Sequence, residues 1–222
     1  MSVSDDLAAA CVPVSDDDRT SQAVLGSASI WNEGTTFGGA PYGDLIDTLR
    51  RLLAATAGAR PDLETIREIT TSFQAAAESL QRFTVAEPEQ VYARRIDLAG
   101  RGQATWPMIM FDQASEQGVD GRVTFDRQFL GANGAAHGGA ITFVFDEVAG
   151  CVAHLGGRSR ARTAYLHAEF RALTPIDVEL RITGRIVREE NRKRIIELKL
   201  FREDMLCAEA EALMIALKPG QL

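Results

Sequence analysis

The stretch GANGAAHGGAITFVFDEVAG, residues 131–150, decides the fold of this chain. From residue 139 to residue 154 it continues as a segment that is apolar at almost every position, and a helix that is apolar on all sides is a buried helix. The apolar positions are Ala140, Ile141, Phe143, Val144, Phe145, Val148, Ala149, Cys151 and Val152. Gly138 and Gly139 stand where a loop becomes this helix. We therefore expect a buried helix that is entered through a glycine-rich loop.

Before this helix, Met108, Met110 and Phe111 precede Gly118, and Val119, Val123 and Phe125 follow it, which predicts two strands joined by a turn. After the helix, residues 165–171, 178–183 and 196–200 alternate between apolar and polar side chains, as half-buried strands do. Residues 207–217 are ambiguous, because their alanines favour a helix whereas their position after the turn at Glu203 and Asp204 favours a final strand. One buried helix followed by an antiparallel meander predicts an α+β fold of the hotdog type, a curved antiparallel sheet wrapped around a central helix.

The first hundred residues form an extension that does not fit a minimal hotdog domain. Residues 1–22 are polar and acidic, and we expect a disordered tail there. Loop residues follow over 26–43, and two amphipathic helices are predicted over 45–57 and 63–80. We therefore divide the chain into the tail 1–22, a loop and helical extension 23–104, and a hotdog domain 105–222. The two helices are expected to dock on that domain or on a partner subunit.

Composition narrows the class of protein. The chain has 222 residues, 45% of them hydrophobic and 25% charged, with a formal net charge of -7. A net acidic chain is a poor candidate for nucleic-acid binding, which requires neutralised phosphates. Three widely spaced cysteines without a CxxC pair make a disulfide framework or a zinc site improbable and favour the cytoplasm. The N-terminus does not resemble a signal peptide, and no stretch approaches the ~18 apolar residues that span a membrane.

Two features of the deciding stretch could carry chemistry. The first amides of a helix lack internal partners and lie at the positive end of its dipole, so the backbone at Gly138 can stabilise an oxyanion. Asp146 is a carboxylate in a nearly apolar helix, which is costly unless it is paired or in use. It is a candidate general base or nucleophile. Glu147 points about 100° away around the helix and cannot easily do the same work.

The spacing of these two groups predicts a dimer. Asp146 lies eight residues beyond Gly138, which is roughly 12 Å along a helix axis. One carbonyl can hardly touch both groups in a single subunit. If both act on one substrate, each must come from a different subunit, which indicates two-fold related sites.

The motif resembles that of the PaaI-like group of hotdog acyl-CoA thioesterases, whose signature is HGG, an Asp or Glu nine residues after the His, and then a small residue. Here these are His137-Gly138-Gly139, Asp146 and Gly150, and the resemblance covers about residues 105–217. It implies hydrolysis of an acyl-coenzyme A thioester, as part of lipid metabolism, by a homodimer or a dimer of dimers. Coenzyme A would be part of the substrate, with no separate cofactor and no metal. Gly138 would supply the backbone donor, and Asp146 would activate water or attack the thioester.

The resemblance also implies further site residues. Many relatives hold the thioester carbonyl with an Asn or Gln six residues before the His; this chain has Gly131 there, and Asn133 is the substitute two residues later. Thr163 matches a Ser or Thr that positions water. His137 and Gly139 would line the substrate, and Arg160 and Arg162 would pair with coenzyme A phosphates.

Each of these residues also has a structural interpretation. Asp146 could be a capped structural carboxylate, and His137 could cap the helix. Asn133 could serve only the turn at Ala132-Asn133-Gly134, and charged loops are usually solvated. Cys151 is interpreted as a buried core residue of the helix, since a reactive thiolate needs an electropositive environment.

Two other functions stay open on the sequence. A hotdog hydratase or dehydratase would need a His paired with a carboxylate, and His137 with Asp146 is the only plausible pair. A non-catalytic acyl-CoA-binding protein is the second, because position 131 lacks the usual Asn or Gln. The sequence does not separate the general-base route from the nucleophilic route, nor does it indicate which acyl group is preferred.

Overall fold

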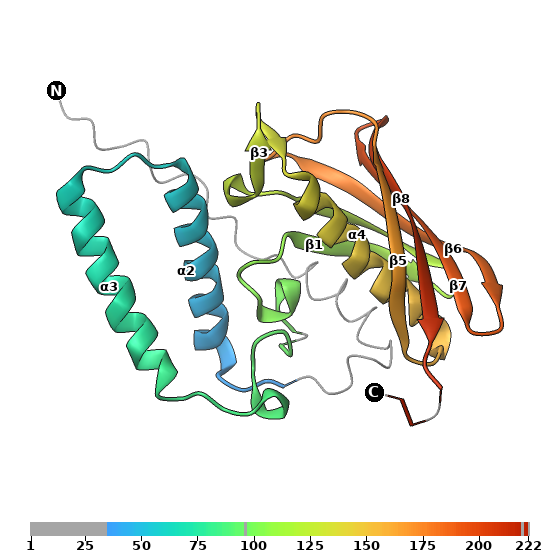
Figure 1. Ribbon diagram of the computed structural model, residues 1–222, viewed down its shortest axis with the longest axis horizontal. Coiled ribbons are helices and arrows are strands. Elements are labelled where there is room, and N and C mark those ends of the chain that lie inside the picture. The colour runs from blue at the N-terminus through green and yellow to red at the C-terminus, as the bar shows by residue number, and fades with distance from the viewer. Residues whose placement is uncertain (1–34, 96, 219, 222) are drawn as a thin grey trace.

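The computed structural model describes residues 35–95, 97–218, 220 and 221, so the predicted acidic tail 1–22 lies outside the described residues. A six-stranded antiparallel sheet curves around one long helix, α4 (Gly138–Ala153), in the arrangement of a hotdog fold (Figure 1). Along the chain its strands are β1 (Met108–Ser115), β2 (Gly118–Thr124), β5 (Ala161–Phe170), β6 (Glu179–Glu190), β7 (Lys193–Arg202) and β8 (Met205–Ala216). In space their order is β1-β2-β6-β7-β8-β5. The predicted fold class is confirmed.

The core lies between α4 and the concave face of the sheet. Val144, Phe145, Val148 and Val152 of α4 are fully buried. The strands opposite contribute Leu180, Ile182, Ile196, Leu198 and Leu200 to the same cluster. The helix approaches β6 closely at Gly184, where an added Cβ would lie 2.9 Å from both Val148 Cγ1 and Val152 Cγ2. The apolar segment predicted from residues 131–150 therefore forms the central helix, with its side chains buried against the sheet.

One side of α4 differs from the prediction. We expected a helix buried on all sides, but Gly139 and Asp146 are exposed, and Thr142, Phe143 and Gly150 are only half-buried. These five positions recur at helical spacing and form one line along the helix, which we call the open stripe. The sheet curves around one side of α4 only, so a single copy of the chain leaves the opposite side uncovered. Asp146 lies on this stripe.

The ambiguous last segment is the strand β8. Its inward face carries Ala208, Ala210 and Ala212, all buried, between the neighbouring strands β7 and β5. Small side chains on that face fit a strand that runs close beneath a central helix. Packing and strand pairing therefore override the helix propensity of alanine.

The extension contains the two predicted helices, α2 (Gly39–Gly58) and α3 (Leu63–Gln81). Asp62 caps α3, its Oδ1 accepting a hydrogen bond from the Thr65 amide over 2.8 Å. The expected loop over residues 26–43 ends earlier than predicted, because α2 begins at Gly39 after Gly38 turns the chain at φ 81°. Two short 3₁₀ helices, η2 (Glu87–Glu89) and η3 (Ala99–Gly102), then lead to β1. They belong to the green segment that runs between α2 and the sheet in Figure 1.

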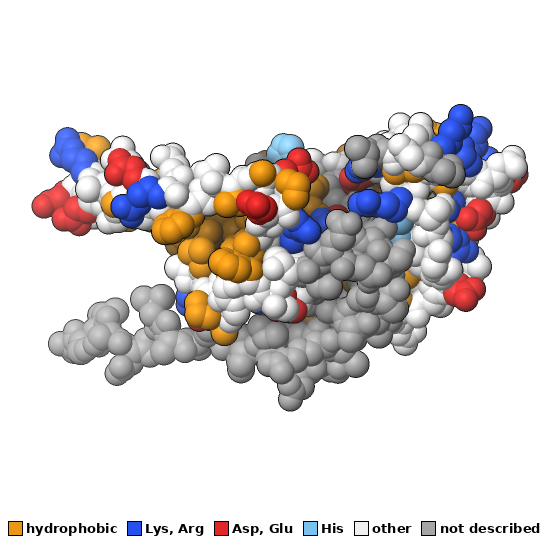
Figure 2. Space-filling view, turned by 90° about the horizontal axis from the view of Figure 1, so that it is seen from below, with side chains coloured by type: hydrophobic (Ala, Val, Ile, Leu, Met, Phe, Trp, Pro, Cys, Tyr) orange, Lys and Arg blue, Asp and Glu red, His pale blue; other side chains and the backbone are white. Residues whose placement is uncertain are grey.

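The two helices of the extension dock to different degrees. Helix α2 buries Ile46 and Arg50 against the rest of the chain, and Arg50 donates hydrogen bonds to the carbonyls of Ala99 and Gln103 over 3.0 and 2.7 Å. Helix α3 buries no residue. Its apolar side chains stay exposed, among them Leu63, Ile66, Ile69, Phe73 and Leu80. The predicted docking on the hotdog domain is thus seen for α2 and not for α3, and Figure 2 shows hydrophobic side chains gathered where the extension meets the rest of the molecule.

Candidate active site

Asp146 and Thr163 come together at the open stripe of α4. The Thr163 hydroxyl, on strand β5, donates a hydrogen bond to Asp146 Oδ1 over 2.8 Å. The pairing of β5 with β8 slips by one residue between Thr163 and Tyr165, which leaves Ala164 as a bulge. A β-bulge re-aims the side chains beside it, so this irregularity bears on how Thr163 meets the helix. Both side chains are exposed in the single chain and accessible to a small molecule.

The start of α4 presents backbone donors at the other end of the stripe. His137 is the N-cap, and its Nδ1 accepts a hydrogen bond from the Gly139 amide over 2.9 Å. The Gly138 amide makes no hydrogen bond with any residue that the structure describes. An amide at this position has no partner within its helix and lies at the positive end of the dipole. Gly138 therefore offers the donor that an oxyanion needs, and His137 serves as a helix cap.

Asp146 and Gly138 belong to the same straight helix, at its middle and its first residue. Eight residues of α-helix separate them by roughly 12 Å along the axis. The structure thus keeps the two groups apart within one chain. One substrate carbonyl therefore cannot contact both groups of a single chain.

Asn133 and Gly131 occupy a small hairpin before α4, formed by β3 (Leu130–Ala132) and β4 (Ala135–Ala136). Asn133 and Gly134 form its tip, both with positive φ, 52° and 73°. Asn-Gly is the pair that such tight hairpin turns prefer, so the turn accounts for Asn133. Position 131 has little room, since an added Cβ would lie 3.0 Å from the His137 Cα. Contact of Asn133 with a thioester carbonyl stays a prediction.

Glu147 lies beside the stripe and is paired with the extension. Its carboxylate lies 3.4 Å from the Arg101 guanidinium. Burial raises the pKa of Glu147 to about 7, Arg101 opposes the rise, and the neighbouring Asp146 charge adds to it. Arg101 also stacks on Trp106, with its Cζ 4.3 Å from the ring centroid, and Trp106 meets Phe143 edge-on with centroids 4.9 Å apart. Glu147 thus braces the helix against residues 101–106.

The remaining titratable groups near α4 are structural. Burial raises the pKa of the Cys151 thiol, which opposes formation of a thiolate nucleophile. His154 lies within 2.5 Å of the Gly150 carbonyl through Nδ1, and its Nε2 accepts from the Ala161 amide over 3.0 Å. Burial lowers the pKa of His154. It fastens the end of α4 to the start of β5.

Arg160 and Arg162 lie just before and within β5, and both are exposed. Neither forms an ion pair with any carboxylate in the described part of the chain, whereas Arg158 is paired with Glu189 over 3.0 Å. Their guanidinium groups therefore face solvent and can meet an anion. Phosphate binding at Arg160 and Arg162 stays a prediction.

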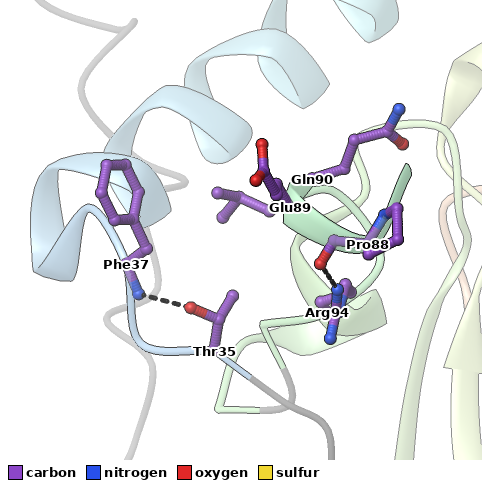
Figure 3. A pocket seen from close by; sticks show the side chains of 7 residues that line it. Thr35, Phe37, Pro88, Glu89, Gln90 and Arg94 are labelled. Atoms are coloured by element: carbon purple, nitrogen blue, oxygen red, sulfur yellow. Dashed lines mark hydrogen bonds between the residues drawn. The ribbon is translucent and has the colours of Figure 1, made fainter. Parts of the chain in front are cut away.

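A hollow elsewhere in the chain is a poor candidate for the site. It is lined by Thr35, Phe37, Pro88, Glu89, Gln90, Val91 and Arg94 (Figure 3), all from the extension. Phe37 and Arg94 are tied to their neighbours there, through Thr35 Oγ1 and the Pro88 carbonyl. Among the described residues, no three His, Cys, Asp or Glu side chains gather as metal ligands would. None of the described helices combines the length and apolar character that a membrane span requires.

Sequence reasoning missed three residues around the stripe. Phe170, at the end of β5, covers the start of α4, so that an added Cβ on Gly138 would lie 3.1 Å from its ring. Arg101 and Trp106 lie between the extension and β1, where no hydrophobic period draws attention to them. The one available signal was the isolated Trp106 directly before a strand.

Comparison with known proteins gives a match for the segment that contains α4. A family model described as the thioesterase superfamily matches residues 133–209, from the Asn133 turn through α4 and most of the sheet. No curated protein matches the chain.

Solved structures of the thioesterase superfamily share the fold. A crystal structure titled as such a protein is 21% identical, with a TM-score of 0.68, and the match covers 78% of this chain and 94% of that one. Residues 105–222 are only just over half of the chain, so this match extends into the helical extension. A Streptococcus mutans protein bound to acetyl-CoA is 19% identical over 49% of this chain and 88% of its own, with a TM-score of 0.47. Thioesterase superfamily member 2 from Mus musculus is 14% identical over 48% and 80%, with a TM-score of 0.44.

Proposed function

We propose that the chain hydrolyses an acyl-coenzyme A thioester to a free acid and coenzyme A. The observation that carries the proposal is the hydrogen bond from Thr163 to Asp146 on the open stripe of a thioesterase-superfamily helix. It leaves the second carboxylate oxygen of Asp146 available for a water molecule or for a carbonyl carbon. Coenzyme A is part of the substrate in this reaction, which needs neither a further cofactor nor a metal.

In the general-base route, Asp146 takes a proton from water as the oxygen attacks the thioester carbon. The carbonyl oxygen becomes an oxyanion, and the Gly138 N–H of the facing subunit stabilises it. The C–S bond then breaks, and the thiolate of coenzyme A leaves with the proton from Asp146. In the nucleophilic route the Asp146 carboxylate itself attacks the thioester carbon, the C–S bond breaks, and the thiolate of coenzyme A leaves. Water then hydrolyses the resulting anhydride to the free acid and the Asp146 carboxylate, and the thiolate takes up the proton that this step sets free. Both routes need the same two groups.

The proposed dimer is supported by strand β5. It is ten residues long and lies at the edge of the sheet, with β8 as its one neighbour. Thr163, Tyr165 and His167 are exposed on it. A long edge strand with unpaired backbone groups is a template for a second chain. Pairing two copies there would bring two open stripes face to face and cover Asp146.

The positions of His137 and Asp146 favour hydrolysis over a hydratase reaction, and the cysteines are consistent with a cytoplasmic enzyme. His137 is the N-cap of α4 and Asp146 lies at the middle of the helix, and the Nδ1 atom of His137 accepts a hydrogen bond from the Gly139 amide. The two side chains therefore do not form an acid–base pair. The described cysteines, Cys151 and Cys207, are both free and buried, which suits a reducing compartment.

The test is release of free thiol from a panel of acyl-CoAs by wild type and by Asp146→Asn. The amide keeps the shape of the side chain but can act neither as base nor as nucleophile. Turnover should fall by at least about 10²-fold, the usual lower range for such a group. Glu147→Gln, which alters the adjacent carboxylate, is the matched control and should be much milder. Release of no thiol by wild type, with tight acyl-CoA binding, would make the chain a binding protein instead.

A further inference from the structure

Asp146 has a different neighbour on each side of the open stripe. On one side stands strand β5, which donates from Thr163. Phe143 and Glu147 lie about 60° and 100° around the helix from Asp146, in the same direction. Both contact residues of the 99–106 segment, Phe143 through Trp106 and Glu147 through Arg101. Anything that reaches the Asp146 carboxylate along the stripe therefore passes between β5 and this segment.

The side formed by the 99–106 segment is apolar and aromatic. Trp106 meets Phe143 edge-on, and both side chains are half-buried, so part of each ring is open to solvent. We call these two rings the aromatic wall. Arg101 stacks on the Trp106 ring, its Cζ 4.3 Å from the centroid, and thereby fixes its position.

The backbone that places Arg101 is held in an unusual conformation. Gly100, Arg101 and Gly102 are consecutive residues with φ of 58°, 56° and 71°. Two of them are glycines, which adopt positive φ readily, but Arg101 is not, and a residue held there indicates a constraint. Buried Arg50 of α2 supports this turn by donating to the carbonyls of Ala99 and Gln103. The extension is thus built to hold Arg101, and through it the wall, beside the catalytic helix.

We propose that the wall of Trp106 and Phe143 binds the apolar part of the acyl group and so sets which acyl-CoAs are hydrolysed. The wall stands one helical turn from Asp146, where the first carbons beyond the thioester carbonyl must lie. Unbranched acyl chains of about six carbons reach across both rings, whereas an acetyl group is too short to do so. This inference rests on the proposed hydrolysis of acyl-CoA and adds the specificity-determining residues.

The experiment compares kcat/KM for hexanoyl-CoA and acetyl-CoA in wild type, Trp106→Ala and Phe143→Ala. Each buried methylene contributes roughly fourfold, so loss of contact with a few of them should lower the hexanoyl-to-acetyl ratio by about tenfold or more. The kcat/KM for acetyl-CoA should fall by a smaller factor than that for hexanoyl-CoA, so the ratio of the two is the readout. The matched control is Phe201→Ala, which removes a ring stacked on Arg181 at 4.2 Å on the sheet, away from α4. Its ratio should stay at the wild-type value.

A binding measurement covers the case in which the alanine variants do not fold. The chain has two tryptophans, Trp31 and Trp106. In the Trp31→Phe, Asp146→Asn protein, hexanoyl-CoA should change the fluorescence of Trp106, and coenzyme A alone should not. The proposal that the aromatic wall binds the acyl group would be wrong if the hexanoyl-to-acetyl ratio were unchanged in a folded Trp106→Ala variant. It would also be wrong if hexanoyl-CoA and coenzyme A changed the fluorescence equally. If wild type released no thiol from any acyl-CoA, the proposed function would be wrong, and the proposed role of Trp106 and Phe143 in substrate specificity would be wrong as well.

Discussion

The hydroxyl of Thr163 and the carboxylate of Asp146 are joined by a 2.8 Å hydrogen bond that links the edge strand β5 to the central helix α4. Asp146 has no ion-pair partner in the described part of the chain, so this bond is its principal restraint. A hydroxyl that donates to one oxygen orients the other toward the reacting atom. Thr163 is therefore a positioning residue whose effect on turnover should be smaller than that of Asp146 itself.

Replacing Thr163 by Val should lower kcat about tenfold. Val keeps the shape of Thr and removes only the donor, and a hydrogen bond to a charged group is commonly worth enough to account for that factor. Thr163→Ser retains a hydroxyl and should recover most of the activity. Steady-state thiol release measures both variants. Equal activity of Val and wild type would mean that Asp146 is oriented by something other than Thr163.

The Gly138 amide can be removed without disturbing the helix. Gly138 is the first helical residue, where proline is well tolerated, and His137 before it has ψ 134°, a value compatible with a following proline. Gly138→Pro should lower turnover by about 10²- to 10³-fold, the usual effect of losing one oxyanion donor. Gly138→Ala keeps the N–H and adds only a Cβ near the Phe170 ring, so it should remain far more active.

Mixing the two damaged subunits tests whether the site is shared. When Gly138→Pro and Asp146→Asn chains are unfolded together and refolded, hybrid dimers hold one site with an intact Gly138 and an intact Asp146. Activity should return to about a quarter of wild type, since about half of the dimers are hybrids with one good site each. Each variant refolded alone is the control. Absence of recovery in verified hybrids would place both groups of a site in one chain.

Glu147 should make stability depend on pH. Its pKa is about 7 in the folded protein, above the ordinary value of 4.5, because burial disfavours the charged form. A raised carboxyl pKa stabilises the fold fully below about pH 4.5, and this contribution is lost as pH rises through 7. The loss corresponds to about 3 kcal/mol. Arg101, Asp146 and the Cys151 thiol are the charged or titratable groups that influence it.

Glu147→Gln removes that titration. The Tm of the Gln variant relative to wild type should therefore rise steadily between pH 5 and pH 8. The attraction of Arg101 for the Glu147 carboxylate acts only where Glu147 is ionised, and it is already contained in the pKa of about 7. Thermal melts of both proteins at each pH give the comparison. Melting curves that stay parallel across the range would show that Glu147 is ionised throughout.

His137 should matter for stability and little for chemistry. Its ring accepts from the Gly139 amide as an N-cap, and loss of a cap costs about 1 kcal/mol. His137→Ala should lower the free energy of unfolding by about that amount with a less than tenfold change in turnover. His137→Asn, which can also cap, should restore the stability. A loss of 10²-fold or more in turnover, at unchanged stability, would support acid–base chemistry by His137.

The strands could be predicted from the sequence because their apolar residues recur with a period of two, and the central helix because it is apolar at nearly every position. Strands β5, β6 and β7 carry a period of two, and α4 has almost no polar residue in its buried part. The strand β8 could not be decided, because its alanines are set by the space beneath α4 rather than by backbone preference. Docking of α2 through the buried Arg50 was equally hidden, since charged residues on a helix usually face solvent.

The candidate site divides in the same way. Asp146, Gly138 and Thr163 were predicted from their spacing in a motif, and the structure brings Thr163 to Asp146. Arg101 lies in the short 3₁₀ helix η3 and Trp106 in the loop after it, and neither has a hydrophobic period that predicts what lies beside α4. The open stripe of α4 escaped prediction as well, since a composition that is apolar all round does not tell which side the sheet leaves uncovered.

The position of β5 at the edge of the sheet has a consequence for biosynthesis. Its one neighbour among the described strands is β8, and Ala161 pairs with Ala216, 55 positions later. At about 5–20 residues per second, a ribosome needs roughly 3–10 s to make the intervening chain. During that interval the nascent polypeptide has α4 and Thr163 but lacks the strand that holds β5 in the sheet. The hydrogen bond from Thr163 to Asp146, on which the proposed hydrolysis depends, can therefore form only after β8 has emerged.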